Sequence, residues 1–440
     1  MLRQVDTRDL TPAQVHETIA RHMLADGFEM VLDLDRSQGS TLVDARDGTD
    51  YLDLFTFFAS SALGMNHPAL VSVEAQRELA AVAVNKPSNS DVYTVPMARF
   101  VETFARVLGD PKLPHLFFVD GGALAVENAL KVAFDWKSRW NEAHGIDPEL
   151  GSRVLHLEQA FHGRTGYTMS LTNTDPNKVA RFPKFDWPRI SSPSINGNPD
   201  VEAAERTSLA QARAAFEAHP HDIACFIAEP IQGEGGDNHF RPEFLQAMQA
   251  LCHEFDALFI VDEVQTGVGM TGTAWAYQQM GLTPDVVAFG KKAQVCGVMA
   301  GGRVDEVRDN VFRVSSRINS TWGGNLTDMV RARRIFEVIE ADGLIDRAGF
   351  LGTHLLHELT ALADRHEMIS HVRGRGLMCA FTLPSAQLRD EVVTRMRERE
   401  HVLMLGCGTS SLRVRPALTI SVPEIDRGIE ALDRVLSDLA

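Results

Sequence analysis

Residues 258–267 read Leu-Phe-Ile-Val-Asp-Glu-Val-Gln-Thr-Gly, an apolar run that ends in acidic and turn-forming residues. A short continuous apolar run bounded by such residues is typical of a strand that is buried on both faces. Similar runs recur along the chain, at His115–Val119, Val154–Leu157, Ile223–Ala228, Leu258–Val261 and Val286–Phe289. Longer helical patterns separate them, including Ala123–Trp140 and Arg241–Glu254. This alternation predicts an α/β fold with a mostly parallel central sheet and right-handed crossovers.

The N-terminal residues follow a different pattern. Thr11-Pro12-Ala13-Gln14 is a good helix start, because it combines a capping threonine, a proline in the first turn and a glutamine three residues after the cap. Gly27 is the expected stop of this helix. Ser40–Asp44 and Asp50–Leu54 read as two strands joined by the turn Asp47-Gly48. This part is too short to bury much by itself, so we expect it to pack on a larger unit.

After about Asp328 the sequence predicts a long helix and then a smaller α+β segment. That segment includes the apolar runs Gly376–Leu383 and Ser411–Val414. We expect a small domain built from both chain ends, with the chain divided into an N-terminal segment, a large domain and a C-terminal small domain at 1–60, 61–328 and 329–440.

Composition bounds the class of protein. The chain has 440 residues and a formal net charge of −16, which argues against a nucleic-acid surface. No run is long and apolar enough to cross a bilayer, and the start lacks the apolar core of a secretory signal. The five cysteines are scattered and predict neither a disulfide framework nor a metal site. These features favour a cytoplasmic enzyme with reduced thiols.

A pair of lysines follows one of the predicted strands, in Val286-Val287-Ala288-Phe289-Gly290-Lys291-Lys292. The carboxyl end of such a strand is where sheet proteins place ligands. A lysine there can form a Schiff base with an aldehyde cofactor, and a neighbouring cation helps to depress its pKa. Taken alone, the pattern also fits a solvated lysine pair at a loop edge.

Two further strand ends carry groups that suit a phosphorylated ring. Asp262 ends an apolar strand, where an unpaired carboxylate is costly, and a pyridinium nitrogen is a fitting partner for it. Gln265 can then bond a phenolic oxygen of the ring. Gly121-Gly122-Ala123 precedes a helix, whose first amides and dipole favour a phosphate. A helix-capping acid and a tight turn are the alternative explanations of these two patterns.

The order of these groups along the chain resembles that of the class III aminotransferases, a family of fold-type I pyridoxal-phosphate enzymes. The resemblance covers nearly the whole chain and includes further motifs: Phe161-His162-Gly163-Arg164-Thr165, Glu229-Pro230-Ile231-Gln232-Gly233-Glu234-Gly235-Gly236, Thr321-Trp322-Gly323-Gly324-Asn325, Arg373-Gly374-Arg375-Gly376-Leu377-Met378 and Arg413-Val414-Arg415-Pro416. It implies that pyridoxal 5′-phosphate is the cofactor and that Phe161 stacks on its ring. It also implies a homodimer in which Thr321 reaches the phosphate of the other subunit.

The chain departs from the family pattern in three places. Gly121-Gly122-Ala123 replaces a serine-glycine-threonine, so the phosphate should depend more on backbone amides and on the partner's Thr321. Met270 stands where the family usually has arginine. Gly290-Lys291-Lys292 replaces the commoner Ser-Lys-Ala or Ser-Lys-Gly. By alignment the Schiff-base lysine is Lys291, with Lys292 as the alternative.

Within the family, the likeness is closest to the lysine 6-aminotransferase branch. It rests on four stretches without an obvious chemical role, namely Phe55–Phe57, Asn85–Tyr93, Phe182–Pro188 and Gln294–Met299. The branch implies transfer of the terminal amino group of L-lysine to 2-oxoglutarate, giving 2-aminoadipate 6-semialdehyde and L-glutamate. The structural alternative for these stretches is packing and dimer contact.

The resemblance also implies how one site accepts two substrates. Arg413 binds the carboxylate next to the keto group, Glu234 pairs with Arg413 when lysine is present, and Arg164 holds the distal carboxylate of either substrate. For each arginine a structural salt bridge is the alternative. Phe57, Phe58 and Asn319 are candidates for setting chain length.

Three other functions remain open at this point. A 4-aminobutyrate or ornithine aminotransferase would use the same residues. An aminomutase or racemase would need no keto acid. A binding protein that has lost its cofactor is disfavoured by the presence of Lys291, Asp262 and Gln265.

Overall fold

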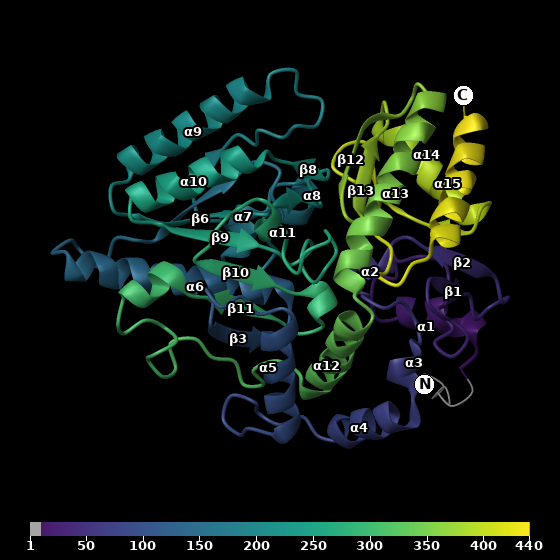
Figure 1. The fold of residues 1–440 in the computed structure, drawn as a ribbon, viewed down its shortest axis with the longest axis horizontal. Helices are drawn as coiled ribbons and strands as arrows, with labels where there is room; N and C mark the ends of the chain where they lie inside the picture. Colours follow the sequence, from purple (N-terminus) through teal and green to yellow (C-terminus); the bar gives the residue numbers. More distant parts are fainter. Residues whose placement is uncertain (1–9, 440) are drawn as a thin grey trace.

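The computed structural model describes residues 10–439. Its centre is a seven-stranded sheet of order β3-β11-β10-β9-β6-β4-β5 (Figure 1). The strands are β3 (His115–Val119), β4 (Arg153–Leu157), β5 (Arg189–Ile190), β6 (Ile223–Ala228), β9 (Leu258–Asp262), β10 (Val286–Phe289) and β11 (Cys296–Ala300). All neighbours from β10 to β5 are parallel, whereas β11 is antiparallel to both β10 and β3. The α/β fold with a mostly parallel sheet is confirmed.

The buried strands explain why the sheet needs helices on both faces. Phe259 and Val261 of β9 belong to one apolar core, and Leu258 and Ile260 belong to another. Because side chains alternate along a strand, these two cores lie on opposite faces of the sheet. Helix α10 (Pro242–Glu254) contributes to the first core and α6 (Gly122–Ala143) to the second. Figure 1 shows α10 and α9 (Val201–Ala218) on one side of the sheet and α6 on the other.

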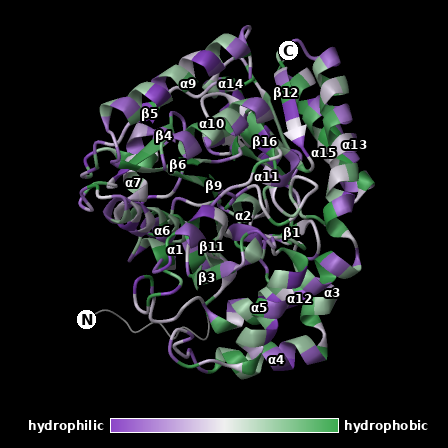
Figure 2. Ribbon diagram, turned by 60° about the vertical axis from the view of Figure 1, so that its left-hand side comes forward, coloured by the Kyte–Doolittle hydropathy of each residue, from purple (hydrophilic) through white to green (hydrophobic). Residues whose placement is uncertain are grey.

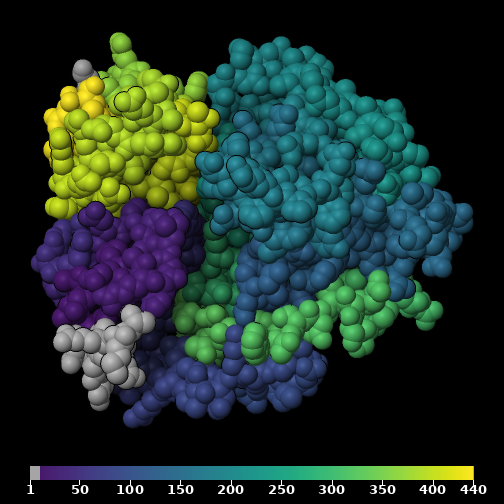
Figure 3. Space-filling model, turned by 180° about the vertical axis from the view of Figure 1, so that it is seen from behind, coloured from purple at the N-terminus to yellow at the C-terminus, as the bar shows by residue number. Residues whose placement is uncertain are grey.

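The two ends of the chain meet in smaller sheets. Strands β1 (Thr41–Val43) and β2 (Asp50–Asp53) form the expected hairpin, and β14 (Val402–Leu403) adds to β2 in parallel. A four-stranded sheet has the order β12-β13-β16-β15, with bounds Ser370–Arg375, Met378–Thr382, Ser411–Val414 and Leu405–Cys407. Figure 3 shows the purple N-terminal and yellow C-terminal residues side by side. The domain boundaries at 60 and 328 stay a prediction, and residues 1–9 of the first segment lie outside the described residues.

Helices cover these sheets and connect them to the large unit. The longest are α5 (Val95–Val107), α12 (Leu326–Ala341), α13 (Leu344–Arg365), α14 (Ala386–Glu398) and α15 (Val422–Ser437). The shorter elements are α1 (Val15–Ala20), α2 (Thr56–Ala59), α3 (Pro68–Val71), α4 (Val73–Ala83), α7 (Thr168–Leu171), α8 (Pro176–Val179), α11 (Ala276–Gln279), β7 (Ile231–Gln232) and β8 (Asn238–His239). Outer helices such as α9 carry both hydrophilic and hydrophobic stripes (Figure 2), as expected of helices that bury one face. Within residues 10–439, none of the helices has both the length and the apolarity that a membrane crossing requires.

Two expectations about elements were wrong, and one strand was not predicted. The first helix ends at Ala20, well before Gly27, although the capping box of Thr11 and Gln14 is present. The single long helix after Asp328 is two helices, α12 and α13, because Gly343 adopts a left-handed conformation (φ 58°) between them. Strand β11 was not expected, since Gly297 interrupts its apolar pattern.

Candidate active site

One edge of the central sheet collects the candidate site residues. Strands β3, β4, β6, β9 and β10 run in the same direction, so their carboxyl ends share this edge. A cavity of about 430 Å³ lies there. It is lined by Gly122, Ala123, Val126, Phe161, His162, Gly163, Arg164, Thr165, Glu229, Asp262, Val264, Gln265 and Lys291. Segments up to 170 residues apart in the sequence therefore supply one site because the strands before them are aligned.

The two adjacent lysines have different surroundings. Lys291 lines the cavity, whereas the Lys292 amine is buried and donates to the Ala59 carbonyl at 2.6 Å. The backbone separates them, since Lys291 has a positive φ of 51° and begins a short 3-10 turn. Burial, aided by the positive charge of Arg413, lowers the pKa of Lys291 to about 8. A substantial neutral fraction near neutral pH makes Lys291 a competent nucleophile and base.

Asp262 is held at the cavity wall by two hydrogen bonds. The buried His162 Nδ1 donates to Asp262 Oδ2 at 2.7 Å, and the Val264 amide donates to Oδ1 at 3.0 Å. Burial alone would lower the pKa of His162, but the hydrogen bond and charge of Asp262 outweigh it and raise that pKa. The sequence motif contained His162 without assigning it a role. In the structure it orients the carboxylate that faces the cavity.

Glu229 joins two loops at the cavity wall. It accepts from the Phe161 amide at 2.9 Å and from the Gly233 amide at 3.1 Å. Burial raises its pKa to about 7. A Cβ at Gly233 would lie 2.3 Å from Gln265 Oε1, so the glycine leaves room for the Gln265 side chain in its present position. The position of the Gln265 side chain thus depends on a loop that is far from it in sequence.

A cluster of charged side chains lies beside Lys291. Arg413 Nη2 and Glu234 Oε2 form an ion pair at 3.0 Å, and Lys178 donates to the other carboxylate oxygen of Glu234. The Arg413 side chain is only 4% exposed. Burial would raise the pKa of Glu234, but Arg413 and Lys178 together hold it below its usual value. Nothing in the sequence pointed to Lys178.

Three predicted residues lie outside the enclosed part of the site or at its rim. Arg164 lines the cavity but is exposed to solvent. Asn319 and Thr321 are exposed on the segment before α12 and do not line the cavity of their own chain. Phe58, a candidate for setting chain length, has its ring 5.9 Å from the Arg413 guanidinium.

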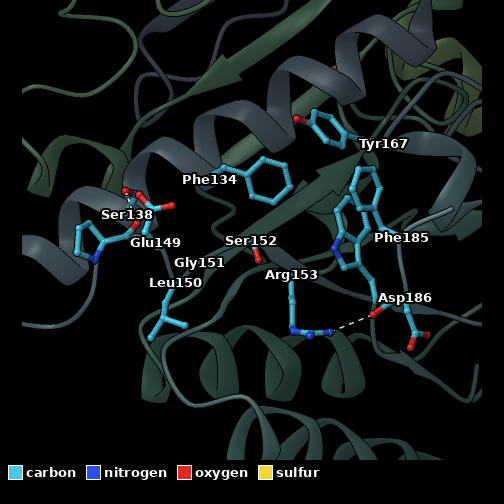
Figure 4. A pocket seen from close by; sticks show the side chains of 12 residues that line it. Phe134, Ser138, Glu149, Leu150, Gly151, Ser152, Arg153, Tyr167, Phe185 and Asp186 are labelled. Carbon is cyan, nitrogen blue, oxygen red and sulfur yellow. Dashed lines mark hydrogen bonds between the residues drawn. The ribbon is translucent and has the colours of Figure 1, made fainter.

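A second cavity, of about 630 Å³, lies near the other half of α6 (Figure 4). Arg153 lines this cavity, and its guanidinium donates hydrogen bonds to the Asp186 carbonyl at 3.0 Å and to the Asp222 carboxylate at 2.8 Å. Much of its wall is made of aromatic rings, namely Phe134, Tyr167, Phe185 and Trp187. Among the described residues its lining contains no lysine, whereas the smaller cavity combines a lysine with an oriented carboxylate and the N-terminus of the long helix α6, so the smaller cavity is the candidate active site.

The residues of the smaller cavity fit pyridoxal 5′-phosphate. Lys291 supplies an amine of lowered pKa, Asp262 an oriented carboxylate, and the N-terminus of α6 an anion cradle. Gly122 opens that cradle, since a Cβ there would lie only 3.0 Å from Val264. The cavity volume is in the range of cofactor sites. Fold and site together therefore define a pyridoxal-phosphate-dependent enzyme.

Comparison with known proteins identifies the family. The aminotransferase class-III model matches residues 23–436. The L-lysine-epsilon aminotransferase of Mycobacterium tuberculosis is 66% identical, over 98% of this chain and 96% of that protein. The L-lysine-epsilon aminotransferase of Streptomyces clavuligerus is 60% identical, over 97% and 95%. A solved structure of lysine aminotransferase from M. tuberculosis superposes with a TM-score of 0.97 at 65% identity and covers 98% of this chain and all of that one. The chain belongs to the class III aminotransferases, and its cofactor is pyridoxal 5′-phosphate.

Proposed function

We propose that this aminotransferase moves the ε-amino group of L-lysine to 2-oxoglutarate, giving 2-aminoadipate 6-semialdehyde and L-glutamate. The observation that carries the proposal is the Arg413–Glu234 ion pair beside Lys291. A buried arginine with its own removable counter-ion allows one site to accept two substrates of different charge. The relatives at 60–66% identity are lysine-epsilon aminotransferases, which favours lysine among the ω-amino acids.

The cofactor supplies an aldehyde that joins to amines and a ring that withdraws electrons from the bond being broken. We assign the residues that hold it as follows: Gly122 and Ala123 amides for the phosphate, Phe161 for the ring face, Asp262 for the ring nitrogen, Gln265 for the phenolic oxygen and Lys291 for the covalent bond. Val264 lines the same cavity and is a further apolar contact.

Lys291 and Asp262 are the proposed catalytic residues. Once the substrate amine has displaced Lys291, the Nζ of Lys291 is free to act as a base. It takes the proton from the substrate carbon that bears the amine and later returns a proton as an acid. A pKa of about 8 suits this exchange, because both protonation states are populated near neutral pH. Asp262, oriented by His162, would face the ring nitrogen and favour its protonated form.

Arg413 and Glu234 adapt the site to each substrate. Lysine presents only methylenes next to its reacting carbon, so Glu234 stays on Arg413 and neutralises it. In 2-oxoglutarate a carboxylate lies beside the keto carbon, and it replaces Glu234 on Arg413. Arg164, exposed at the cavity rim, holds the distal carboxylate of either substrate through a two-pronged contact.

We further propose a homodimer in which Thr321 completes the phosphate site of the opposite subunit. Thr321 and Asn319 are exposed and lie outside their own cavity, which fits a role across an interface. The adjacent Trp322 is a large aromatic side chain that is 45% exposed, which also fits a contact surface. Light scattering of the purified protein tests the dimer. The cytoplasmic location stays a prediction, which cell fractionation with immunoblotting would test.

Steady-state rates with a panel of amine donors and 2-oxoglutarate test the reaction. L-[ε-¹⁵N]lysine should pass its label to glutamate, and the carbon product should be the cyclised semialdehyde. A larger kcat/KM for 4-aminobutyrate or ornithine would overturn the substrate assignment. Retention of ¹⁵N in the carbon product would exclude ε-transfer, and full turnover without a keto acid would indicate a mutase or racemase.

A further inference from the structure

Glu234 is shared between two cations that come from different parts of the chain. Its Oε2 accepts from Arg413 Nη2 at 3.0 Å, and its Oε1 accepts from Lys178 Nζ. Arg413 is deeply buried, whereas Lys178 and Glu234 are 28% and 24% exposed. The carboxylate therefore lies between a buried inner cation, Arg413, and an outer cation near solvent, Lys178.

The outer cation lies where there is room for the carboxylate to move. Lys178 and Glu234 both line a solvent-open cavity of about 480 Å³, which Lys291 does not line, together with Gln159, Asp175 and Gly408. The backbone of Glu234 is fixed, since its carbonyl accepts from the Gly408 amide at 2.9 Å. Movement off Arg413 is therefore a side-chain rotation into this cavity.

Such a rotation leaves a partly buried carboxylate in need of a new partner. Breaking an ion pair while one charge stays unpaired is far more costly than exchanging one partner for another. Lys178 already contacts the carboxylate and sits on the short helix α8, whose cap Asp175 accepts from the Asn177 amide at 2.9 Å. Its amine can follow the carboxylate, because a lysine side chain is long and flexible.

We propose that Lys178 is a positioning residue that keeps Glu234 paired when a substrate carboxylate takes over Arg413. This inference rests on the proposed function and assigns Lys178 to its second half-reaction. Without Lys178, Arg413 is the remaining cation among these contacts of Glu234. Glu234 then competes more strongly with the carboxylate of 2-oxoglutarate for Arg413. With lysine as substrate Glu234 does not leave Arg413, so Lys178 matters much less.

The test compares the two half-reactions of the holoenzyme in Lys178→Met. Stopped-flow absorbance follows the aldehyde form with L-lysine and, separately, the amino form with 2-oxoglutarate. We expect the apparent dissociation constant for 2-oxoglutarate to rise about tenfold and that for lysine to change by less than about threefold, where tenfold corresponds to about 1.4 kcal/mol. Calorimetry with glutarate, a dicarboxylate without a keto group, should show the same tenfold loss without any chemistry.

Three controls separate positioning from a structural defect. Lys178→Arg should restore most of the 2-oxoglutarate affinity, and Arg181→Gln removes a nearby exposed charge and should have no effect. On a Glu234→Gln background, Lys178→Met should no longer change 2-oxoglutarate binding, because Lys178 acts through Glu234. Equal losses in both half-reactions, or an undiminished effect on that background, would overturn the role of Lys178. If the unsubstituted enzyme fails to transfer the ε-nitrogen of lysine, the proposed function itself fails.

Discussion

Replacing Glu234 with glutamine should reverse the balance between the two half-reactions. Arg413 Nη2 and Glu234 Oε2 are 3.0 Å apart, and two unit charges about 4 Å apart, the scale of such an ion pair, attract by about 4 kcal/mol at an effective dielectric constant of about 20. Glu234 is 24% exposed, and a glutamine can still accept one hydrogen bond from Arg413. We therefore reduce the expected loss to about 1.5–3 kcal/mol, or about 10–150-fold in kcat/KM for lysine.

The same substitution should help the acceptor. In Glu234→Gln, 2-oxoglutarate no longer displaces an anion from Arg413, so its KM should fall, and L-glutamate should become a better amine donor. Single-turnover absorbance measurements on each half-reaction give the two effects separately. Glu217→Gln, which removes an exposed charge from α9, serves as the control. Equal losses for lysine and 2-oxoglutarate would refute the reasoning, since they would indicate general damage to the site.

The remaining predictions address the cofactor residues. Borohydride reduction of the holoenzyme followed by peptide mapping should label Lys291, because the Lys292 amine is buried in a hydrogen bond to the Ala59 backbone carbonyl. A label on Lys292, or on neither lysine, contradicts the assignment. In the apoenzyme, amine-reactive labelling of Lys291 should rise with pH through a midpoint near 8, because the neutral amine reacts and its pKa is lowered to about 8; a midpoint near the usual 10.5 would show that burial has no such effect. Asp262→Asn should lower kcat about 100-fold or more, the scale of losing one preorganised electrostatic contact, and an unchanged kcat would remove Asp262 from the mechanism. Thr321→Ala should weaken cofactor binding about tenfold, as expected for one lost hydrogen bond to a charged group, and co-assembly with a Lys291→Ala subunit should restore it; no recovery would exclude Thr321 as a contact across the dimer.

Much of the fold could be predicted because its strands are buried on both faces. A strand such as Leu258–Val261 must be apolar throughout, so its sequence is distinctive, and the structure confirms it as part of β9. The prediction was incomplete or wrong at two positions that contain a glycine. Gly297 interrupts the apolar run of β11, which was not predicted, and Gly343, with a positive φ, divides one expected helix into two. Propensity and periodicity describe average preferences, and they detect such local breaks poorly.

The candidate site could be predicted in part for a topological reason. Parallel strands place their carboxyl ends at one edge, so residues that follow different strands, such as Asp262 and Lys291, were expected to meet. The direction in which each of the two lysine side chains points could not be predicted from the sequence. Adjacent lysines look alike in a sequence, and a positive φ at Lys291 is what turns one amine into the cavity and leaves the other against Ala59.

The sequence by itself determined the class of fold, the strand ends that carry chemistry and, through the family motifs, the cofactor. The tertiary structure decided which lysine faces the cavity, that His162 orients Asp262, and that Lys178 and Arg413 share one carboxylate. These last pairs join residues that are 56 and 179 positions apart. Hydrogen bonds and ion pairs act over about 3 Å, and distances of that kind are set by how whole elements pack rather than by the local order of residues.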